Sequence, residues 1–261
     1  MNLNLKDKVY LISGGAKGIG EAISRILAEE GAIPVLIDPS LEEGKKIIKD
    51  IEDNGGKAAQ YAHRLSQTKD AQNAVEFVIE KFGRIDGVVN NAGANDSVGL
   101  EKGSPESFRS SVEKNLGHYY DLVHFALPYL KNSRGAIVNI SSKTAITGQG
   151  NTSGYTAAKG AQLSLTREWA VELLPYGIRV NAVIPAEVMT PLYKTWLDTF
   201  ENPNEKRSEI EKRIPLENRM TKPQEIADMV VFLLSPRSSH TTGQLIFVDG
   251  GYTHLDRAIG T

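Results

Sequence analysis

The sequence contains no cysteine among its 261 residues. This absence excludes thiolate nucleophiles, disulfides and cysteine-ligated metals. The chain has five histidines, namely His63, His118, His124, His240 and His254. Their spacing is not that of metal ligands, so we expect no dedicated metal site.

An excess of charge of one sign is also missing, because 30 basic and 32 acidic residues leave a net charge of −2. No electrostatic footprint for nucleic acid or an anionic membrane follows from such a balance. No run reaches the roughly 18 apolar residues that span a bilayer, and residues 1–8 lack the apolar core of a signal peptide. We therefore expect a cytoplasmic protein whose partner is a small molecule, with no nucleic-acid or membrane partner.

Short apolar runs alternate with longer amphipathic stretches along the chain. The first run, Val9 to Ile12, precedes a helix-like stretch at 18–30 and a second apolar run at 33–37, which is the pattern of a β-α-β unit. Further helices are expected at 40–54, 68–82, 104–131, 153–174 and 222–234, and further strands at 57–62, 85–89, 135–140, 178–184 and 244–248. Strands of near-continuous Val, Ile and Leu are typical of a parallel sheet covered on both faces. The sequence predicts an α/β fold, a single-domain Rossmann-type doubly wound parallel sheet of seven strands with helices on both faces.

No repeat, low-complexity tract or Pro-, Gly- or Ser-rich linker divides residues 1–261, so we expect one domain. The polar and charged segment 190–213, with Trp196 and Phe200, interrupts the alternation. Ligands of such sheets bind beyond the carboxyl ends of the strands. Because this segment follows a strand, we predict a substrate lid near residues 186–213.

The first strand is followed by the segment SGGAKGIG, residues 13–20, with glycines at positions 14, 18 and 20 among others. Glycine permits a tight turn and close approach of the backbone, and a helix N-terminus attracts a phosphate group. A glycine cluster can also be an ordinary strand-to-helix turn. The pattern G-x3-G-x-G nevertheless indicates a pyrophosphate site at this point of the chain.

Asp38 ends the second expected strand, 18 residues after Gly20. A carboxylate about 20 residues beyond a glycine turn accepts hydrogen bonds from the adenosine ribose and repels a 2′-phosphate. Lys17 points to the opposite preference, since a cation beside the turn can pair with that phosphate. We give Asp38 the greater weight and predict NAD as cofactor, with NADP less favoured.

Tyr155 and Lys159 stand at i and i+4 near the start of an expected helix, so their side chains share one face. A nearby ammonium favours the phenolate of a tyrosine, whose pKa is ordinarily about 10, and so suits it to acid–base work. The same spacing is common in surface pairs. Ser142, at the end of the fifth expected strand, lies where its hydroxyl could hold a substrate oxygen.

Together these motifs resemble the short-chain dehydrogenase/reductase family over essentially the whole chain. The resemblance implies four catalytic residues: Asn115, Ser142, Tyr155 and Lys159. Tyr155 would exchange the proton, Ser142 would orient the reacting oxygen, and Lys159 would also hold the nicotinamide ribose. Asn115 would anchor a water of the proton relay.

The glycine turn and the resemblance together give a set of expected cofactor-binding residues. They are Gly14, Lys17, Gly18, Ile19, Gly20, Asp38, Arg64, Leu65, Asn91, Ala92, Gly93, Tyr155, Lys159, Pro185, Val188 and Thr190. Two positions depart from the family pattern. Ala186 replaces a usual glycine, which implies an ordinary negative φ or a displaced loop, and Arg64 replaces an aspartate that accepts from adenine.

The loops expected to rim the cleft are polar, which favours a hydroxyl-rich ligand, although loops are polar in general. The residues predicted to bind substrate are Asn95, Ser142, Lys143, Gln149, Tyr155, Glu187 and Trp196. Trp196 could close over the apolar face of a sugar or equally pack a helix against the body of the protein.

Residues 142–151, 185–193 and 250–258 resemble the bacterial L-fucose dehydrogenase group within the family. This implies an NAD-dependent oxidoreductase that converts the anomeric hydroxyl of L-fucose or a related aldose to the lactone. The alternatives are a reductase of 3-oxoacyl thioesters or small ketones and a nucleotide sensor without chemistry, which predicts a broken catalytic set. The resemblance also implies a homotetramer or homodimer formed through helices 104–131 and 153–174 and the C-terminal helix and strand.

Overall fold

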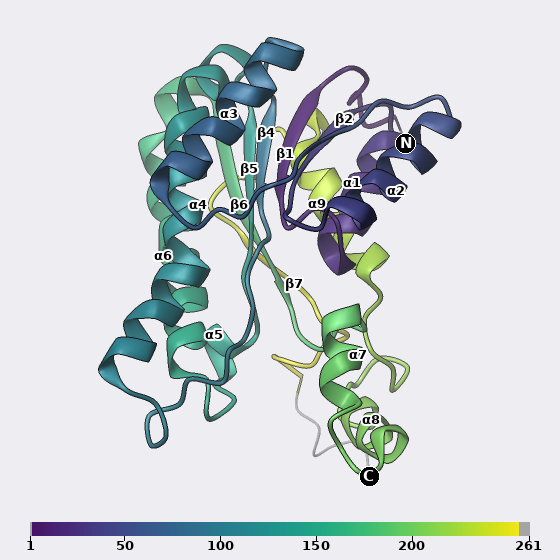
Figure 1. Cartoon of the computed structure of the whole chain (residues 1–261), viewed down its shortest axis with the longest axis vertical. Helices are drawn as coiled ribbons and strands as arrows, with labels where there is room; N and C mark the ends of the chain where they lie inside the picture. The colour runs from purple at the N-terminus through teal and green to yellow at the C-terminus, as the bar shows by residue number, and fades with distance from the viewer. Residues whose placement is uncertain (1, 256–261) are drawn as a thin grey trace.

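The computed structural model describes residues 2–255 and contains one seven-stranded sheet (Figure 1). Its strands are β1 (Val9–Ser13), β2 (Ile33–Ile37), β3 (Ala59–Tyr61), β4 (Gly87–Asn90), β5 (Ala136–Ile140), β6 (Arg179–Pro185) and β7 (Leu245–Val248). They pair in parallel in the order β3-β2-β1-β4-β5-β6-β7. The strand order reverses between β1 and β4, which is where doubly wound sheets bind their ligands. The predicted fold class is confirmed.

Six long helices cover the two faces of the sheet (Figure 1). They are α1 (Gly18–Glu29), α2 (Leu41–Asp53), α3 (Thr68–Phe82), α4 (Pro105–Ser133), α6 (Ser153–Glu172) and α9 (Pro223–Leu234). On one face α1 packs against α2 and α9, and on the other α4 packs against α3 and α6. Short 3-10 turns, η1 (Leu174–Tyr176) and η2 (Pro236–Ser238), precede β6 and β7.

The sheet separates two apolar cores because successive side chains of a strand point to opposite faces. In β1, Leu11 packs on the α3–α4–α6 side with Leu122, whereas Ile12 packs on the α1–α9 side with Ile23. All four of these side chains are fully buried. Each such burial contributes about 1.5–3 kcal/mol, so the two cores hold the strand ends, and the loops that follow them, in place.

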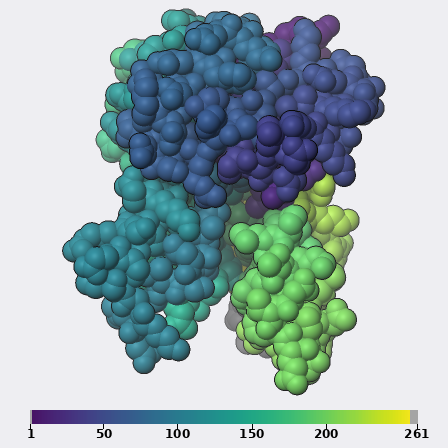
Figure 2. Space-filling model, in the orientation of Figure 1, coloured from purple at the N-terminus to yellow at the C-terminus, as the bar shows by residue number. Residues whose placement is uncertain are grey.

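Three short helices lie beyond the carboxyl ends of the strands, where the sequence predicted only loops and a polar interruption. They are α5 (Thr144–Thr147), α7 (Pro191–Leu197) and α8 (Pro203–Glu211). The Thr190 hydroxyl caps α7 by accepting from the Tyr193 N–H at 3.2 Å, and Pro191 supplies the preset φ of a first helical residue. In Figure 2 the segment with α7 and α8 forms a green lobe, and the surface is hollowed between it and the teal region opposite.

Between residues 2 and 255, no helix combines the length and the apolar content needed to cross a membrane.

Candidate active site

The glycine turn has backbone geometry that side chains would disturb. Gly14 and Gly18 have φ values of +67° and +57°, which favour glycine. At Gly20 an added Cβ would lie 2.0 Å from the Gly14 carbonyl oxygen, so the turn closes only without a side chain there. The N-terminus of α1 therefore opens directly onto the carboxyl ends of the strands, as an anion site requires.

The chain that follows β4 braces this turn. Asn91 donates its side-chain amide to the carbonyls of Ser13 and Gly14 at 2.9 and 3.2 Å. The Ser13 hydroxyl in turn accepts from the backbone N–H groups of Asn91 and Ala92. These bonds fix the turn to the sheet at the point where strand order reverses.

Asp38 and Lys17 lie at the same end of the site with different surroundings. The Asp38 carboxylate is 7% exposed and accepts from the backbone N–H groups of Ser40 at 2.8 Å and Ala16 at 3.3 Å. Lys17 forms an ion pair of 2.7 Å with Glu43, and both side chains are half exposed. The cation that favoured NADP in the sequence therefore already has an anionic neighbour.

A cleft of about 800 Å³ runs from this end to Ser142. Most of the predicted cofactor residues line it: Gly14, Lys17, Gly18, Ile19, Asp38, Arg64, Leu65, Asn91, Ala92, Gly93, Tyr155, Lys159, Pro185, Val188 and Thr190. Gly20 lies outside the lining and acts through the shape of the turn. Ala186, where the family usually has glycine, also lines the cleft and is not among the residues with positive φ.

Ser142, Tyr155 and Lys159 come together at the other end of the cleft. The Lys159 Nζ lies 5.5 Å from the centre of the Tyr155 ring. Burial raises the pKa of Tyr155 to about 12, although a hydrogen bond with Ser142 acts to lower it. Burial lowers the pKa of Lys159 to about 7. A charged group that enters this end of the cleft would therefore interact with Tyr155 and Lys159, whose pKa values are already shifted by burial.

Asn115 lies fully buried beside the cleft rather than in its lining. Its side chain accepts from the Ala94 N–H at 2.9 Å and donates to the Ser111 carbonyl at 2.9 Å. Its own carbonyl accepts from the Gln162 amide at 2.8 Å. Asn115 thus joins α4, α6 and the loop after β4 next to the cleft.

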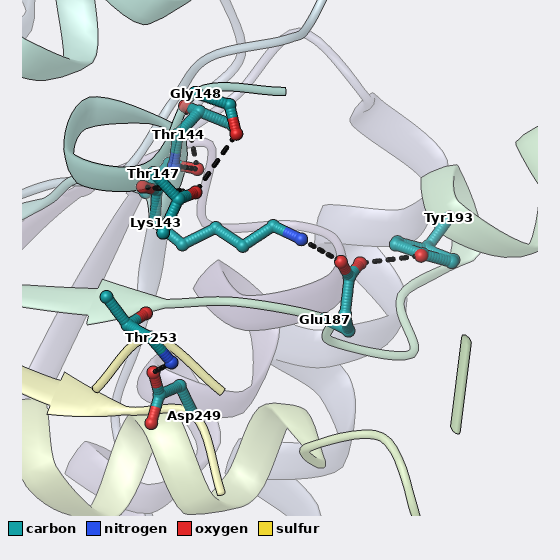
Figure 3. A network of polar contacts seen from close by, with 9 residues as sticks. Lys143, Thr144, Thr147, Gly148, Glu187, Tyr193, Asp249 and Thr253 are labelled. Atoms are coloured by element: carbon teal, nitrogen blue, oxygen red, sulfur yellow. Dashed lines mark hydrogen bonds and ion pairs between the residues drawn. The ribbon is translucent and has the colours of Figure 1, made fainter. Parts of the chain in front are cut away.

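A cluster of ionisable side chains lies next to Ser142, and we refer to Lys143, which is buried, and Glu187, Tyr193 and Tyr252, which are partly buried, as the substrate-end cluster. Lys143 forms an ion pair with Glu187, and their side chains are 8% and 12% exposed. Tyr193 donates its hydroxyl to the other Glu187 oxygen at 2.6 Å (Figure 3). The Lys143 Nζ lies 4.0 Å from the centre of the Tyr252 ring, which is the distance of a cation–π contact. Of the four, Tyr193 lines the cleft.

The remaining predicted substrate residues do not meet in the cleft. Asn95 and Gln149 are exposed on loops, and Asn95 accepts from the Ser97 N–H. Trp196 is 42% exposed and packs edge-on against the rings of Tyr193 and Phe200. Its ring contacts are therefore with its own segment, and it does not line the cleft. The part of the 250–258 resemblance at residues 256–258 lies outside the described residues.

Several residues at the site escaped the sequence reasoning. His118 lines the cleft, and burial lowers its pKa to about 4. Tyr119 is fully buried against Lys159, and Tyr193 faces the cleft. His118 and Tyr119 stand at i+3 and i+4 from Asn115, and this helical spacing is the sequence signal that could have placed them at the site.

The residues present fit a dinucleotide. The turn cannot accept a Cβ at Gly20, the helix N-terminus faces the cleft, and a buried carboxylate stands at the end of β2. Gly14, Gly18 and Asp38 would hold its phosphates and ribose, and Lys159 and Thr190 would hold its nicotinamide half. Across residues 2–255 no group of three or more His, Asp or Glu side chains is arranged to hold a metal ion.

A tyrosine, a lysine and a serine at the end of a dinucleotide-type cleft define an oxidoreductase that acts on CH–OH groups. A family model described as enoyl-(acyl carrier protein) reductase matches residues 14–253. The chain belongs to the short-chain dehydrogenase/reductase family, as its motifs predicted.

Individual relatives cover the whole fold. The crystal structure of Cj0485 dehydrogenase is 48% identical, with a TM-score of 0.94 and 99% of each chain covered. The 3-oxoacyl-[acyl-carrier-protein] reductase FabG of Thermotoga maritima is 37% identical over 95% of this chain and 99% of its own. The L-fucose dehydrogenase of Mus musculus is 35% identical over 94% of this chain and 88% of its own.

Proposed function

We propose that the protein is an NAD-dependent dehydrogenase that oxidises the anomeric hydroxyl of an aldose, L-fucose or a related sugar, to the lactone. The substrate-end cluster carries this proposal. A buried ion pair is often no more stabilising than apolar residues of the same volume, so its place beside Ser142 calls for a function. Sugar hydroxyls both donate and accept hydrogen bonds, and Tyr193 brings such a group to the cleft wall.

The proposed chemistry assigns one task to each catalytic residue. Tyr155, as phenolate, takes the proton of the anomeric hydroxyl while the anomeric carbon gives up hydride. Bound NAD supplies the hydride acceptor. Ser142 donates to the developing carbonyl oxygen, and Lys159 stabilises the phenolate and holds the nicotinamide ribose. Asn115 acts beside the cleft through its bonds to Ala94 and Ser111.

NAD is the proposed cofactor because both neighbouring carboxylates oppose a 2′-phosphate. Asp38 is nearly buried, so its charge is poorly screened by solvent. Glu43 forms an ion pair with Lys17, the cation that a 2′-phosphate would need.

Reduction of a 3-oxoacyl thioester or small ketone is the second candidate. The FabG relative and the apolar Leu192 in the cleft lining favour it. The two candidates differ in whether substrate binding uses the substrate-end cluster.

The test is a comparison of turnover by the purified protein. L-fucose, D-arabinose and L-galactose are supplied with NAD, and 3-oxoacyl esters with NADH or NADPH. We expect NADH formation with at least one sugar and a larger kcat/KM for it than for any ester. Turnover of the esters alone would refute the sugar assignment, and a preference for NADP would refute the cofactor assignment.

The proposal includes a lid and an oligomer. Residues within 186–193 line the cleft, and the segment 186–213, with α7 and α8, would close over a sugar. Val171, in the last turn of α6, and Leu174, in η1 directly after it, are 68% and 58% exposed, which suits a homodimer or homotetramer formed through α4 and α6. Light scattering would test the assembly, and a monomer at micromolar concentration would refute it.

A further inference from the structure

A second tyrosine hydroxyl lies at the amine of Lys159. Tyr119, on α4, donates its hydroxyl to the Ile140 carbonyl at 3.2 Å and accepts from the Lys159 Nζ at 3.3 Å. Lys159 also donates to the same carbonyl at 2.7 Å. The three polar atoms form a closed triangle at the end of β5, and the Tyr119 side chain is fully buried.

The Lys159 Nζ is also placed between two aromatic rings. It lies 5.4 Å from the centre of the Tyr119 ring and 5.5 Å from that of the Tyr155 ring. These distances are within the range of cation–π attraction. Tyr119 thus supplies an acceptor and a nearby aromatic ring to the amine from α4, a different helix from the one that carries Tyr155 and Lys159.

We propose that Tyr119 is a positioning residue of the active site, which holds the Lys159 ammonium in place and charged beside Tyr155. A buried ammonium needs acceptors for its three N–H groups. Tyr119 and Ile140 supply two of them from within the protein. The third N–H remains for groups in the cleft, which is where the reaction takes place.

The register between the two helices is fixed by a separate bond. Gln162, on α6 with Lys159, donates to the carbonyl of Asn115, one turn before Tyr119 on α4. Because Asn115 and Tyr119 are four residues apart, this bond sets the turn that carries the Tyr119 hydroxyl. Tyr119 therefore meets Lys159 at a defined position rather than through a mobile side chain.

The titratable groups that face Lys159 are Tyr155 on its own helix and His118 and Tyr119 on α4. The lowered pKa of His118, about 4, keeps it neutral near pH 7. Burial raises the pKa of Tyr119 well above 10, so this tyrosine stays protonated. Titration near neutral to alkaline pH therefore involves Lys159 and Tyr155 alone among these groups.

The sign of the expected effect follows from these charges. Without the Tyr119 hydroxyl the ammonium loses an acceptor, so the pKa of Lys159 falls and its stabilisation of the Tyr155 phenolate weakens. The pKa of Tyr155 then rises. Oxidation needs the phenolate, so the acid limb of the pH profile moves to higher pH.

The test compares Tyr119→Phe with Tyr120→Phe, which removes a hydroxyl from the adjacent, 54% exposed position. For Tyr119→Phe we expect the acid limb of kcat/KM to move up by about one pH unit and kcat at pH 7 to fall about tenfold. Tyr120→Phe should leave both unchanged. If Tyr119→Phe keeps the acid limb of the wild type, or no longer folds, the Tyr119 hydroxyl serves only to stabilise the core and the proposal is overturned.

A double-mutant cycle separates positioning from packing without any turnover. NADH affinity is measured by fluorescence for Tyr119→Phe, Lys159→Met and the double variant. If Tyr119 acts through Lys159, its substitution changes affinity in the wild type and leaves it unchanged in the Lys159→Met background. An equal loss in both backgrounds contradicts the proposal.

Discussion

The glycine turn and the substrate-end cluster occupy opposite ends of one cleft and are built differently. At the turn, backbone atoms of adjacent residues form the surface, and Gly20 contributes by having no side chain. At the cluster, side chains from after β5, β6 and β7 meet, and Lys143 and Glu187 are 44 residues apart in the chain. The first end depends on backbone shape and the second on the pairing of buried charges.

Because of this difference, the two ends of the cleft tolerate different substitutions. A backbone site fails when a Cβ is added and is insensitive to most neighbouring side chains. A buried ion pair fails when one partner is lost and can survive the loss of both. Substitutions at the two ends should therefore affect cofactor affinity, substrate use and stability in different proportions.

The largest effect is expected at Tyr155, at the end of the cleft away from the glycine turn. Tyr155→Phe keeps the ring and removes the proton carrier, so kcat should fall by about 10⁴-fold. NADH affinity, measured by fluorescence titration, should stay within about threefold because the turn is untouched. Turnover close to that of the wild type would refute the acid–base role.

Gly20→Ala breaks the cofactor end. Its Cβ would displace the Gly14 carbonyl, and NADH affinity should weaken by about 100-fold or more, measured by calorimetry. Gly160→Ala, in α6, is the matched control because an added Cβ there meets no atom within 4 Å. Equal NADH affinity in both variants would contradict the geometry of the turn.

Glu187→Met breaks the substrate end by leaving the Lys143 charge buried and unpaired. The free energy of unfolding should fall by about 3 kcal/mol in denaturant titrations. In the double variant Lys143→Met/Glu187→Met most of this stability should return, whereas sugar kcat/KM should stay about tenfold or more below the wild type. If the double variant turned over the sugar as fast as the wild type, the cluster would have only a structural role.

Glu43→Gln sharpens the comparison with a small effect. It releases Lys17, so kcat/KM with NADP should rise about threefold, while the value with NAD stays unchanged. Glu42→Gln is the control, since Glu42 pairs with Lys45 on the same helix at 2.9 Å. The measurement is steady-state kinetics with both cofactors. An equal change of kcat/KM in Glu43→Gln and Glu42→Gln would contradict this assignment.

The sequence predicted the seven strands, the six long helices and the residues at their ends because burial on both faces leaves a continuous apolar pattern. It did not predict α7 and α8 as helices; α8 is mostly polar and contains no buried residue. Lys143 and Glu187 were both expected to face a ligand, and in the structure they face each other. Pairing between side chains of distant loops depends on the order of the strands in the sheet, and the local hydrophobic pattern of the sequence does not specify that order.

Thr190 packs against the glycine turn, where a Cβ at Gly18 would lie 3.2 Å from its methyl group, and its hydroxyl also caps α7. The segment that follows is therefore attached to the glycine turn by a short junction. Such a junction lets the downstream segment diverge in sequence and length while the cofactor stays in register. Grafting residues 191–213 from a relative onto this chain should exchange substrate preference as a module, which makes Thr190 the natural splice point for engineering.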